Sequence, residues 1–312
     1  MKILLTNVGR RTYFIDYLND LIKKNKDIEI YISDRSKKVA SYFTNVSKFL
    51  VLPKVIGNHK NYINSLLKKC HENKIDLIIP LSDLDLLPLS LNKSRFKNQN
   101  CDILISKPKV IKICENKFEL NKFLKKNNIK FPINFENDKD MIFPIISKPS
   151  DGSGSRNVFI YKKKDELPSR LDKKFIYQKF ISGQEYGLDI LNDFNGRFIS
   201  YCLKKKIEMR SGETDKAFTI NNEQILKLSK KISKNLKHIG NLDCDLIISK
   251  NKSIFVIDFN CRFGGGYPFT HAIGLNFLEY LINDKLNEKN IKLPQKYEEK
   301  FIAKGIKVFH EN

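Results

Sequence analysis

The residues best suited to chemistry lie in one short stretch, residues 255–266, with the sequence FVIDFNCRFGGG. Its first half has the pattern of a buried strand. Side chains two residues apart on a strand point to the same face, so Asp258 and Asn260 are expected to project together. Arg262 and three glycines follow directly. Side-chain oxygens next to an arginine and a run of glycines predict a site for a hard metal ion such as Mg²⁺.

A second acidic strand precedes this stretch and is expected to pair with it. Residues 243–248, DCDLII, are separated from it by the polar segment 249–253, which favours a β-hairpin. We expect Asn251 and Lys252 to form a two-residue turn. Antiparallel pairing about that turn sets Asp245 opposite Asp258, and Asp243 opposite Asn260.

This pairing gathers four oxygen-bearing side chains on one face of the hairpin. Like charges directly opposite each other destabilise a sheet unless something neutralises them. Mg²⁺, which prefers carboxylate, carbonyl and phosphate oxygens, would do so. The alternative interpretation is the exposed polar face of an ordinary hairpin.

A loop of glycines and serines lies upstream, in residues 151–157. The strand before it, 143–149, carries Lys148, and a further strand, 158–161, follows. Small residues let backbone N–H groups approach phosphate oxygens, and serine hydroxyls add donors. Because the loop joins strand to strand and lacks the G-x-x-x-x-G-K-[ST] pattern, it is not a P-loop. A plain hairpin turn is the alternative to a phosphate-binding loop.

Two apolar strands, 175–181 and 187–191, flank a short polar joint at 182–186. Such a joint could place backbone groups against a nucleobase and the Glu185 carboxylate against a ribose hydroxyl. An edge hairpin is the alternative interpretation.

Basic residues that could bind a substrate follow on the next strand, 201–206, which places Lys204 and Lys206 on one face. Arg210 then begins a loop, 210–213, that is expected to lie over the active site. A guanidinium can hold a carboxylate through two parallel hydrogen bonds, so Arg210 is the candidate for the substrate carboxylate. The alternative is a solvated basic loop.

The elements that position these residues begin with an α/β layer. Residues 1–107 alternate strand and helix patterns, which predicts a parallel sheet with helices on its faces. Residues 108–130 are expected to be helical, with Lys117 near the start of one helix. No G-x-G-x-x-G pattern is present, so NAD is not expected. Open sheets bind ligands beyond the carboxyl ends of their strands, which nominates Asn7, Gly9, Arg10, Asp34, Ser82, Asp83 and Asp85.

Composition narrows the class of protein. The chain has 312 residues, of which 41% are hydrophobic, and this length suggests two or three domains with buried cores. Its formal net charge of +22 invites a nucleic-acid partner. The excess is almost entirely lysine spread along predicted helices and loops, so we favour a solvated surface and expect no nucleic acid.

The spacing of the cysteines and the length of the apolar runs indicate in which cellular compartment the protein is expected. The six cysteines show no C-x-x-C spacing and are expected to be buried thiols. No apolar run approaches the roughly 20 residues of a membrane helix. We therefore expect no membrane partner and a cytoplasmic location.

Five segments, taken in chain order, resemble the ATP-grasp superfamily, specifically its carboxylate–amine ligases and the synthetase halves of carbamoyl-phosphate synthase large subunits. The resemblance covers nearly the whole chain. It implies an α/β fold with a Rossmann-like preATP-grasp domain over residues 1–107, followed by an ATP-grasp domain of two α+β subdomains, 108–182 and 183–312. The segments are Asn116-Lys117, the strand of Lys148, the loop 152–155, residues 177–185, and Asp245 together with residues 258–266.

The resemblance also implies a role for each segment, with ATP and Mg²⁺ (or Mn²⁺) as cofactors. Lys117 and Lys148 would contact the ATP phosphates, and Gly152, Ser153, Gly154 and Ser155 would fold over them. The adenine hinge would be Gln178, Lys179, Phe180 and Ile181, with Glu185 on the ribose. Asp245, Asp258 and Asn260 would hold the metal, and Arg262 would stabilise the transferring phosphoryl group. Two positions depart from the family pattern: Asp258, where many relatives carry glutamate, and Cys261, where proline is common.

The activity implied is an ATP-dependent ligase that joins a small-molecule carboxylate to an amine or ammonia through an acyl phosphate. These small molecules are the expected partners, and a homodimer is compatible with the sequence. Two alternatives stay open: a basic nucleic-acid-associated protein, and an ATP-binding protein without catalysis.

Overall fold

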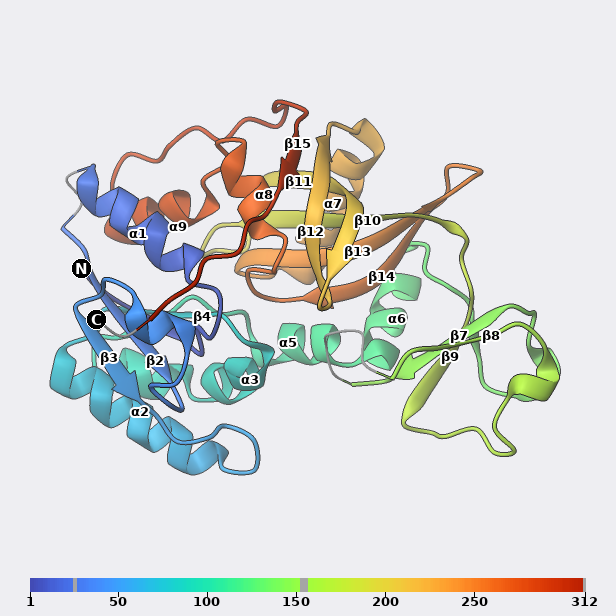
Figure 1. Ribbon diagram of the computed structural model, residues 1–312, viewed down its shortest axis with the longest axis horizontal. Helices are drawn as coiled ribbons and strands as arrows, with labels where there is room; N and C mark the ends of the chain where they lie inside the picture. The colour runs from blue at the N-terminus through green and yellow to red at the C-terminus, as the bar shows by residue number, and fades with distance from the viewer. Residues whose placement is uncertain (25–26, 152–156, 311–312) are drawn as a thin grey trace.

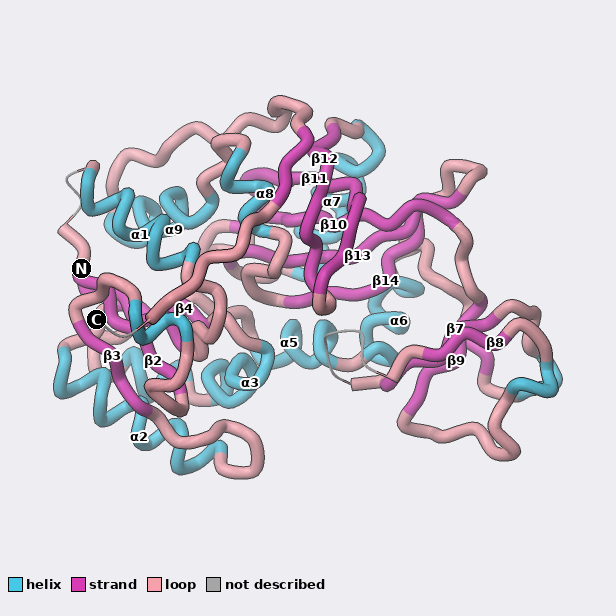
Figure 2. The backbone as a smooth tube through the Cα atoms, viewed as in Figure 1, coloured by secondary structure: helices cyan, strands magenta, loops and turns pink. Residues whose placement is uncertain are grey.

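The computed structural model describes residues 1–24, 27–151 and 157–310. Three β-sheets lie along its longest axis (Figure 1). The chain builds the N-terminal sheet first, then a sheet in the lobe at the opposite end, and finally returns to build the central sheet between them. Figure 2 shows the same arrangement with all strands in magenta and all helices in cyan.

The N-terminal sheet is parallel and has the strand order β3-β2-β1-β4-β5. Alternate residues of β1 face two different cores: Ile3 and Leu5 pack against α1, whereas Leu4 packs against α2. Helices thus cover both faces, as predicted. The elements are β1 (Lys2–Thr6), α1 (Tyr13–Lys23), β2 (Glu29–Asp34), η1 (Ala40–Phe43), β3 (Lys48–Val51), α2 (His59–Asn73), β4 (Leu77–Pro80), α3 (Asp83–Leu91), α4 (Lys93–Lys97) and β5 (Asp102–Ile103).

The lobe sheet is small and antiparallel, with the order β6-β9-β7-β8. Its core contains Met141, Ile145 and Tyr177. Two helices lead into it, and the second begins at Lys117 because the Asn116 side chain caps it, accepting hydrogen bonds from the N–H groups of Phe118 and Glu119. The elements are α5 (Pro108–Glu115), α6 (Lys117–Lys126), β6 (Asn134–Phe135), η2 (Asp138–Asp140), β7 (Ile145–Pro149), β8 (Phe159–Tyr161), η3 (Lys164–Glu166) and β9 (Phe175–Lys179).

The central sheet is antiparallel, with the order β14-β13-β10-β11-β12-β15. The side chains of Leu188, Ile190, Leu242 and Cys244 are fully buried in its core, on the face that packs against the helices. The elements are β10 (Gly183–Asn192), β11 (Phe198–Arg210), β12 (Glu213–Ile220), α7 (Glu223–Leu236), β13 (Gly240–Ser249), β14 (Ile254–Asn260), α8 (Tyr267–Ala272), α9 (Phe277–Leu286) and β15 (Phe301–Ala303).

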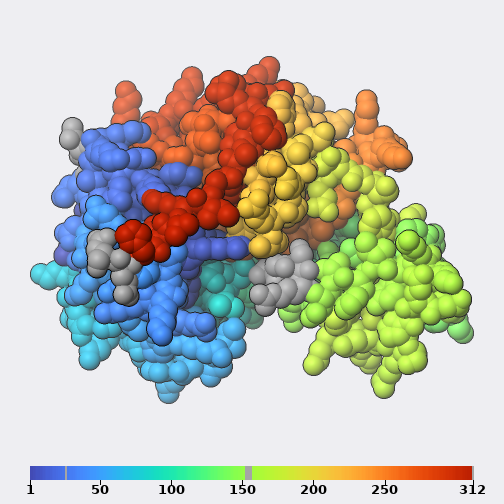
Figure 3. All heavy atoms as spheres, in the orientation of Figure 1, coloured from blue at the N-terminus to red at the C-terminus, as the bar shows by residue number. Residues whose placement is uncertain are grey.

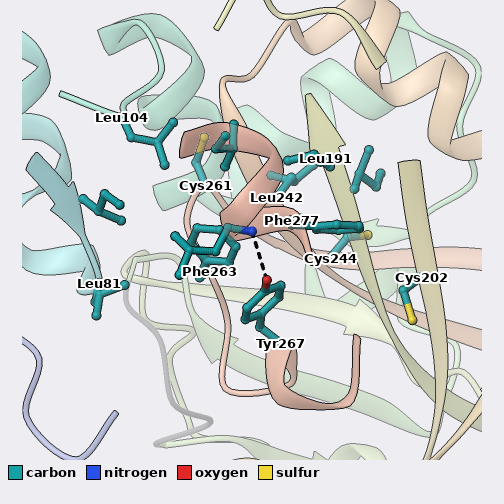
Figure 4. Packing of buried hydrophobic residues seen from close by; sticks show 14 of the residues in the cluster. Leu81, Leu104, Leu191, Cys202, Leu242, Cys244, Cys261, Phe263, Tyr267 and Phe277 are labelled. Carbon is teal, nitrogen blue, oxygen red and sulfur yellow. Dashed lines mark hydrogen bonds between the residues drawn. The ribbon is translucent and has the colours of Figure 1, made fainter. Parts of the chain in front are cut away.

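One hydrophobic core joins the N-terminal domain to the turn after β14. Phe263 and Tyr267 lie in one cluster with Leu81 and Leu104 of the N-terminal domain (Figure 4). The ring of Phe14 in α1 is 5.2 Å from that of Phe263 and 5.6 Å from that of Tyr267. Each such aromatic pair contributes about 0.5–1.5 kcal/mol beyond its buried area. The turn that carries Arg262 is therefore held from both domains.

The residues after β15 cross the front of the molecule from the central sheet to the N-terminal domain (Figure 1, Figure 3). We call residues 304–310 the crossing segment. Lys307 Nζ in this segment lies 3.5 Å from Asp16 Oδ1 of α1. The crossing segment thus bridges the two domains a second time.

The predicted joint at 182–186 is shorter than expected. Strand β10 begins at Gly183, so Gln184 and Glu185 belong to the strand and pair with Ile248 and Ile247. The edge-hairpin alternative is wrong, because β9 lies in the lobe sheet and β10 in the central sheet. Residues 180–182 are the connection between two sheets.

Two composition-based expectations can be compared with the structure. All six cysteines are buried and free, as predicted. Of the helices in the described ranges, none combines the length and the apolar character that crossing a membrane requires.

Candidate active site

Strands β13 and β14 form the predicted hairpin, which we call the acidic hairpin. It has the predicted residue pairs but not the predicted turn. Asp245 lies opposite Asp258, and Asp243 opposite Asn260. Ser249 N–H bonds Ser253 O at 3.0 Å, so the loop has three residues, 250–252, and Lys252 adopts a left-handed φ of 62°. The extra loop residue shifts the register by one, and a β-bulge between Val256 and Asp258 shifts it back. The shift from the longer loop and the shift from the bulge cancel, so the predicted acidic pairs are present.

Lysines neutralise the hairpin carboxylates. Lys117 Nζ lies 3.7 Å from Asp258 Oδ2, and Lys206 Nζ lies 2.7 Å from Asp245 Oδ1. Lys148 Nζ donates to the carbonyl of the bulge residue Ile257 at 3.4 Å. Burial raises the pKa of Asp258, and the charges of Lys117 and Lys148 oppose that rise. Both lysines assigned to the ATP phosphates therefore converge on Asp258.

The donor set on the hairpin suits Mg²⁺ better than a closed metal cage. Within the described part of the chain, no three Asp, Glu, His or Cys side chains gather into a metal-binding group. The predicted set is two carboxylates facing each other across the strands and the Asn260 amide. Mg²⁺ is usually held by one or two carboxylates together with substrate phosphates and water, so the residues present fit this ion.

Arg262 links the hairpin to the N-terminal domain. Its Nη2 donates to Asp83 Oδ2 at 2.5 Å, and its Nη1 donates to Phe263 O at 3.0 Å and lies 4.0 Å from Asp243 Oδ2. Burial lowers the pKa of Arg262, but the carboxylates of Asp83 and Asp243 together raise it by more. The guanidinium therefore stays charged. Asp83 was nominated from its place beyond β4, and the structure brings it into the site.

Each glycine after Arg262 makes room for one charged side chain. A β-carbon on Gly264 would overlap the Asp243 carboxylate. A β-carbon on Gly265 would lie 2.5 Å from Glu213 Cδ, and one on Gly266 would lie 3.3 Å from Lys204 Nζ. The glycine run is thus required by close approach of charged groups.

Lys204 is the buried support of this turn. Its Nζ forms an ion pair with Asp189 and donates to Gly266 O at 3.3 Å. Thr270 Oγ1 and Asn241 Nδ2 also donate to Asp189. Sequence reasoning missed Asp189; its signal was a carboxylate on the same face as Gly187 and Leu191 in an otherwise apolar strand.

Of the residues assigned to adenine, Gln178 and Lys179 end β9, and Phe180 and Ile181 lie in the connection from the lobe sheet to the central sheet. Lys179 N–H donates to Ile133 O at 2.9 Å, and Phe180 N–H donates to Pro144 O at 3.0 Å, which fixes the connection that continues to Ile181. The Gln178 side chain is buried and donates to Asn134 Oδ1 at 2.8 Å, so it supports the lobe. Glu185 projects from β10 and lies 3.9 Å from Lys206.

The glycine–serine loop and Arg210 were both assigned to the site. Gly152, Ser153, Gly154 and Ser155 fall outside the described residues. Arg210 ends β11, and the expected loop 210–213 is a two-residue turn at Ser211 and Gly212, both with positive φ. The Arg210 side chain is 57% exposed and pairs with Asp215 at 3.6 Å, so no hairpin carboxylate is its partner.

Histidine and cysteine near the turn have packing roles. His271 stacks on Tyr17 with ring centroids 3.6 Å apart. Cys261 is buried, and its Sγ lies 2.9 Å from Ser106 Oγ. Asp85, nominated at the sheet edge, is buried and accepts from Thr6, Asn7 and Tyr62, so it holds β1 to α2.

Comparisons with known proteins give two family matches. Residues 3–104 match the PylC-like N-terminal domain, and residues 114–266 match the ATP-grasp domain. The carbamoyl-phosphate synthase of Methanobrevibacter smithii is 22% identical over 321 residues, covering 94% of this chain and 82% of that protein.

Solved structures share the fold at low identity. The biotin carboxylase domain of Hydrogenobacter thermophilus 2-oxoglutarate carboxylase, determined with MgADP, ADP and bicarbonate, matches with a TM-score of 0.74 and 14% identity over 94% of this chain and 71% of that one. The L-amino acid ligase of Bacillus licheniformis matches with a TM-score of 0.68 and 17% identity, covering 93% and 75%.

Proposed function

This chain belongs to the ATP-grasp superfamily and is an ATP-dependent, ADP-forming carboxylate–amine ligase, and we propose that it activates a small-molecule acid as an acyl phosphate and couples it to an amine or ammonia. The observation that carries this proposal is the convergence of Lys117, Lys148 and Arg262 on the acidic hairpin. Fixed cations and oxygen ligands at one place are what phosphoryl transfer needs, because its catalysis is mainly positioning and charge stabilisation.

The nucleotide would lie between the lobe and the central sheet. Lys117 and Lys148, which face Asp258, would turn to the phosphates of ATP, and Glu185 would bind the ribose. Mg²⁺ held by Asp245, Asp258 and Asn260 would neutralise the β- and γ-phosphates and stabilise developing charge. The backbone from Lys179 to Ile181 would contact the adenine, because it leads from the end of β9 into the connection between the two sheets.

In the first step, a carboxylate oxygen of the substrate attacks the γ-phosphorus. The bond between that phosphorus and the oxygen that bridges to the β-phosphate breaks, and ADP leaves with the electron pair. Negative charge on the peripheral oxygens increases as the phosphoryl group moves. Arg262 is held by Asp83 and by Phe263 O before the reaction. Its positive charge can therefore stabilise the negative charge of the transition state without a movement of the side chain.

In the second step, the amine nitrogen attacks the carbonyl carbon of the acyl phosphate. The bond from that carbon to the phosphate oxygen breaks, phosphate leaves, and the nitrogen gives up a proton to form the amide. Both steps require a substrate positioned beside the turn 264–266.

The test is ADP release in the presence of ATP, Mg²⁺ and a panel of amino acids, sugar acids and amines. Asp258→Ala and Arg262→Ala should each lower carboxylate-dependent ADP release by about 10²-fold or more, the usual effect of removing one group that stabilises transition-state charge. Glu72→Ala, on the exposed face of α2, is the matched control and should retain full activity. Undiminished turnover in both active-site variants would refute the mechanism.

Melting curves separate this proposal from its alternatives. ATP and Mg²⁺ together should raise Tm, because a ligand that binds only the folded state stabilises it. A joint rise without ADP release would indicate an ATP-binding protein without catalysis. No joint rise would favour a partner attracted by the surface lysines.

A further inference from the structure

We propose that Arg10, Arg11 and Lys304 form a subsite for a second, non-reacting anionic group on the acid substrate, a carboxylate or a phosphate ester. This inference rests on the proposed function and adds the substrate class: an acid with two anionic groups. The three cations come from separate parts of the chain. Arg10 and Arg11 lie in the connection from β1 to α1, and Lys304 begins the crossing segment.

The three cations meet at one carboxylate, that of Glu213 at the start of β12. Glu213 Oε1 lies 3.4 Å from Arg10 Nη2 and 3.8 Å from Arg11 Nη2, and Glu213 Oε2 lies 3.8 Å from Lys304 Nζ. One carboxylate facing three cations leaves an excess of two positive charges. The neighbouring Arg262 is already matched by Asp83, so it does not add to that excess.

Mutual repulsion of the cations is visible at Lys304. Burial lowers its pKa, the carboxylates of Glu213 and Asp215 raise it, and the positive charges of Lys204 and Arg10 lower it. An incoming anion would relieve this repulsion. Arginine suits such a ligand because its planar fork of N–H groups matches carboxylate and phosphate oxygens.

The donors of this cluster are not used up by Glu213. The three separations, 3.4 to 3.8 Å, are longer than the usual length of about 2.7–3.2 Å for an N–H···O hydrogen bond, so Glu213 holds the cations mainly by charge. Lys304 Nζ donates to Gly265 O at 2.6 Å, and Arg11 donates to Leu81 O. Arg10 is 63% exposed in its side chain and, among the described residues, donates no side-chain hydrogen bond. Its guanidinium is therefore available to a ligand.

A buried hydroxyl beside the cluster also lacks a partner. Tyr13, two residues after Arg11, has a hydroxyl that is shielded from solvent and has no hydrogen-bond partner within the described ranges. Buried hydroxyls are nearly always satisfied. The charges of Arg11 and Glu213 both act on this group, which places it beside the cluster.

The glycine turn places this subsite next to the reaction. Gly265 faces Glu213, and Gly264 faces Asp243 of the acidic hairpin. Consecutive Cα atoms are about 3.8 Å apart, so the two carboxylates flank neighbouring residues of one turn. A small acid could then place its reacting carboxylate near Arg262 and its second anionic group near Arg10 and Lys304.

The test compares acids that differ by one anionic group: succinate with butyrate, and 3-phosphoglycerate with glycerate. For the two-anion acid of the preferred pair, Arg10→Gln and Lys304→Gln should each raise KM about tenfold or more in the ADP-release assay, with KM for ATP unchanged. The matching one-anion acid should show no such rise. Glu213→Gln should act in the opposite direction and lower KM, because it removes the internal anion that competes with the substrate. Lys307→Gln, in the same crossing segment, is the control.

The succinate pair and the phosphoglycerate pair distinguish a carboxylate subsite from a phosphate subsite. Equal KM changes for both members of a pair would overturn the subsite, and so would a rise in KM with Glu213→Gln.

Calorimetric titration of succinate and 3-phosphoglycerate into the full chain with MgADP gives a second readout that needs no turnover. No binding of either acid overturns the subsite. Binding that Arg10→Gln weakens, without ADP release by any acid, upholds the subsite and refutes the proposed function instead.

Discussion

Replacing Lys204 by methionine should destabilise the protein more than any surface lysine change. The Lys204 side chain is 2% exposed, and that of its partner Asp189 is fully buried. Burial lowers the pKa of Lys204, but the Asp189 carboxylate raises it by more, so the lysine keeps its positive charge. Lys204→Met leaves a buried carboxylate with only the neutral donors Thr270 and Asn241.

The expected loss follows from the cost of an uncompensated buried charge. Breaking a buried ion pair by removing one partner costs about 3–5 kcal/mol, and the whole chain is stable by only about 5–15 kcal/mol. The loss is therefore a large fraction of the free energy of unfolding. Replacing both residues, in Lys204→Met with Asp189→Leu, removes the stranded charge and should recover about 2 kcal/mol or more.

Urea unfolding followed by circular dichroism measures these differences. Lys216→Met is the matched control, because Lys216 pairs with Glu208 on the neighbouring strand of the same sheet but both side chains are exposed. Its effect should be a small fraction of that of Lys204→Met. If Lys204→Met is as stable as the control, or if the double variant is no more stable than the single one, the ion pair does not support the turn.

Two further predictions concern pH and the glycine turn. Burial lowers the pKa of His238 to about 4, whereas unfolded histidine titrates near 6.5, so the unfolded chain binds the extra proton between these values. The contribution of His238 to the free energy of unfolding should fall by about 3 kcal/mol as pH drops from 6.5 to 4, and the difference between the unchanged protein and His238→Gln, measured in urea titrations at several pH values, should change by this amount. Gly264→Ala should lower ADP release about tenfold or more with an unchanged circular dichroism spectrum, because its β-carbon would displace the Asp243 carboxylate. Gly305→Ala, whose β-carbon meets open space, should match the unchanged protein in both assays.

The acidic hairpin shows how far a sequence pattern reaches. Alternation fixed which residues of β14 share a face, and the acidic pairs followed correctly. The predicted two-residue turn was wrong. Asn-Lys has no strong preference for such a turn, and Lys252 adopts the left-handed conformation within a longer loop. The prediction of the pairs was right because the bulge at Ile257 offsets the longer loop, and bulges leave no clear mark in sequence.

The contacts between residues of different domains could not be predicted from local sequence patterns. Asp83 was nominated from its position beyond a strand, but its partner Arg262 lies 179 residues away. Arg11 and Lys304 received no role, and Glu213 appeared only as the last residue of a predicted loop, because each is an ordinary charged residue until the fold brings them together. Periodicity reports which side of an element is buried; it does not report which distant charge it will meet.

The position of Lys304 has a consequence for synthesis. Strand β15 pairs with β12, and Lys304 then donates to Gly265 O. The lysine that completes this contact is therefore translated about 40 residues after the glycine it holds. Domains generally fold from the N-terminal side as the ribosome releases them, so the N-terminal sheet and the lobe can form while the glycine turn still lacks this contact. The emerging chain carries an unfinished active site until residue 304 has left the exit tunnel.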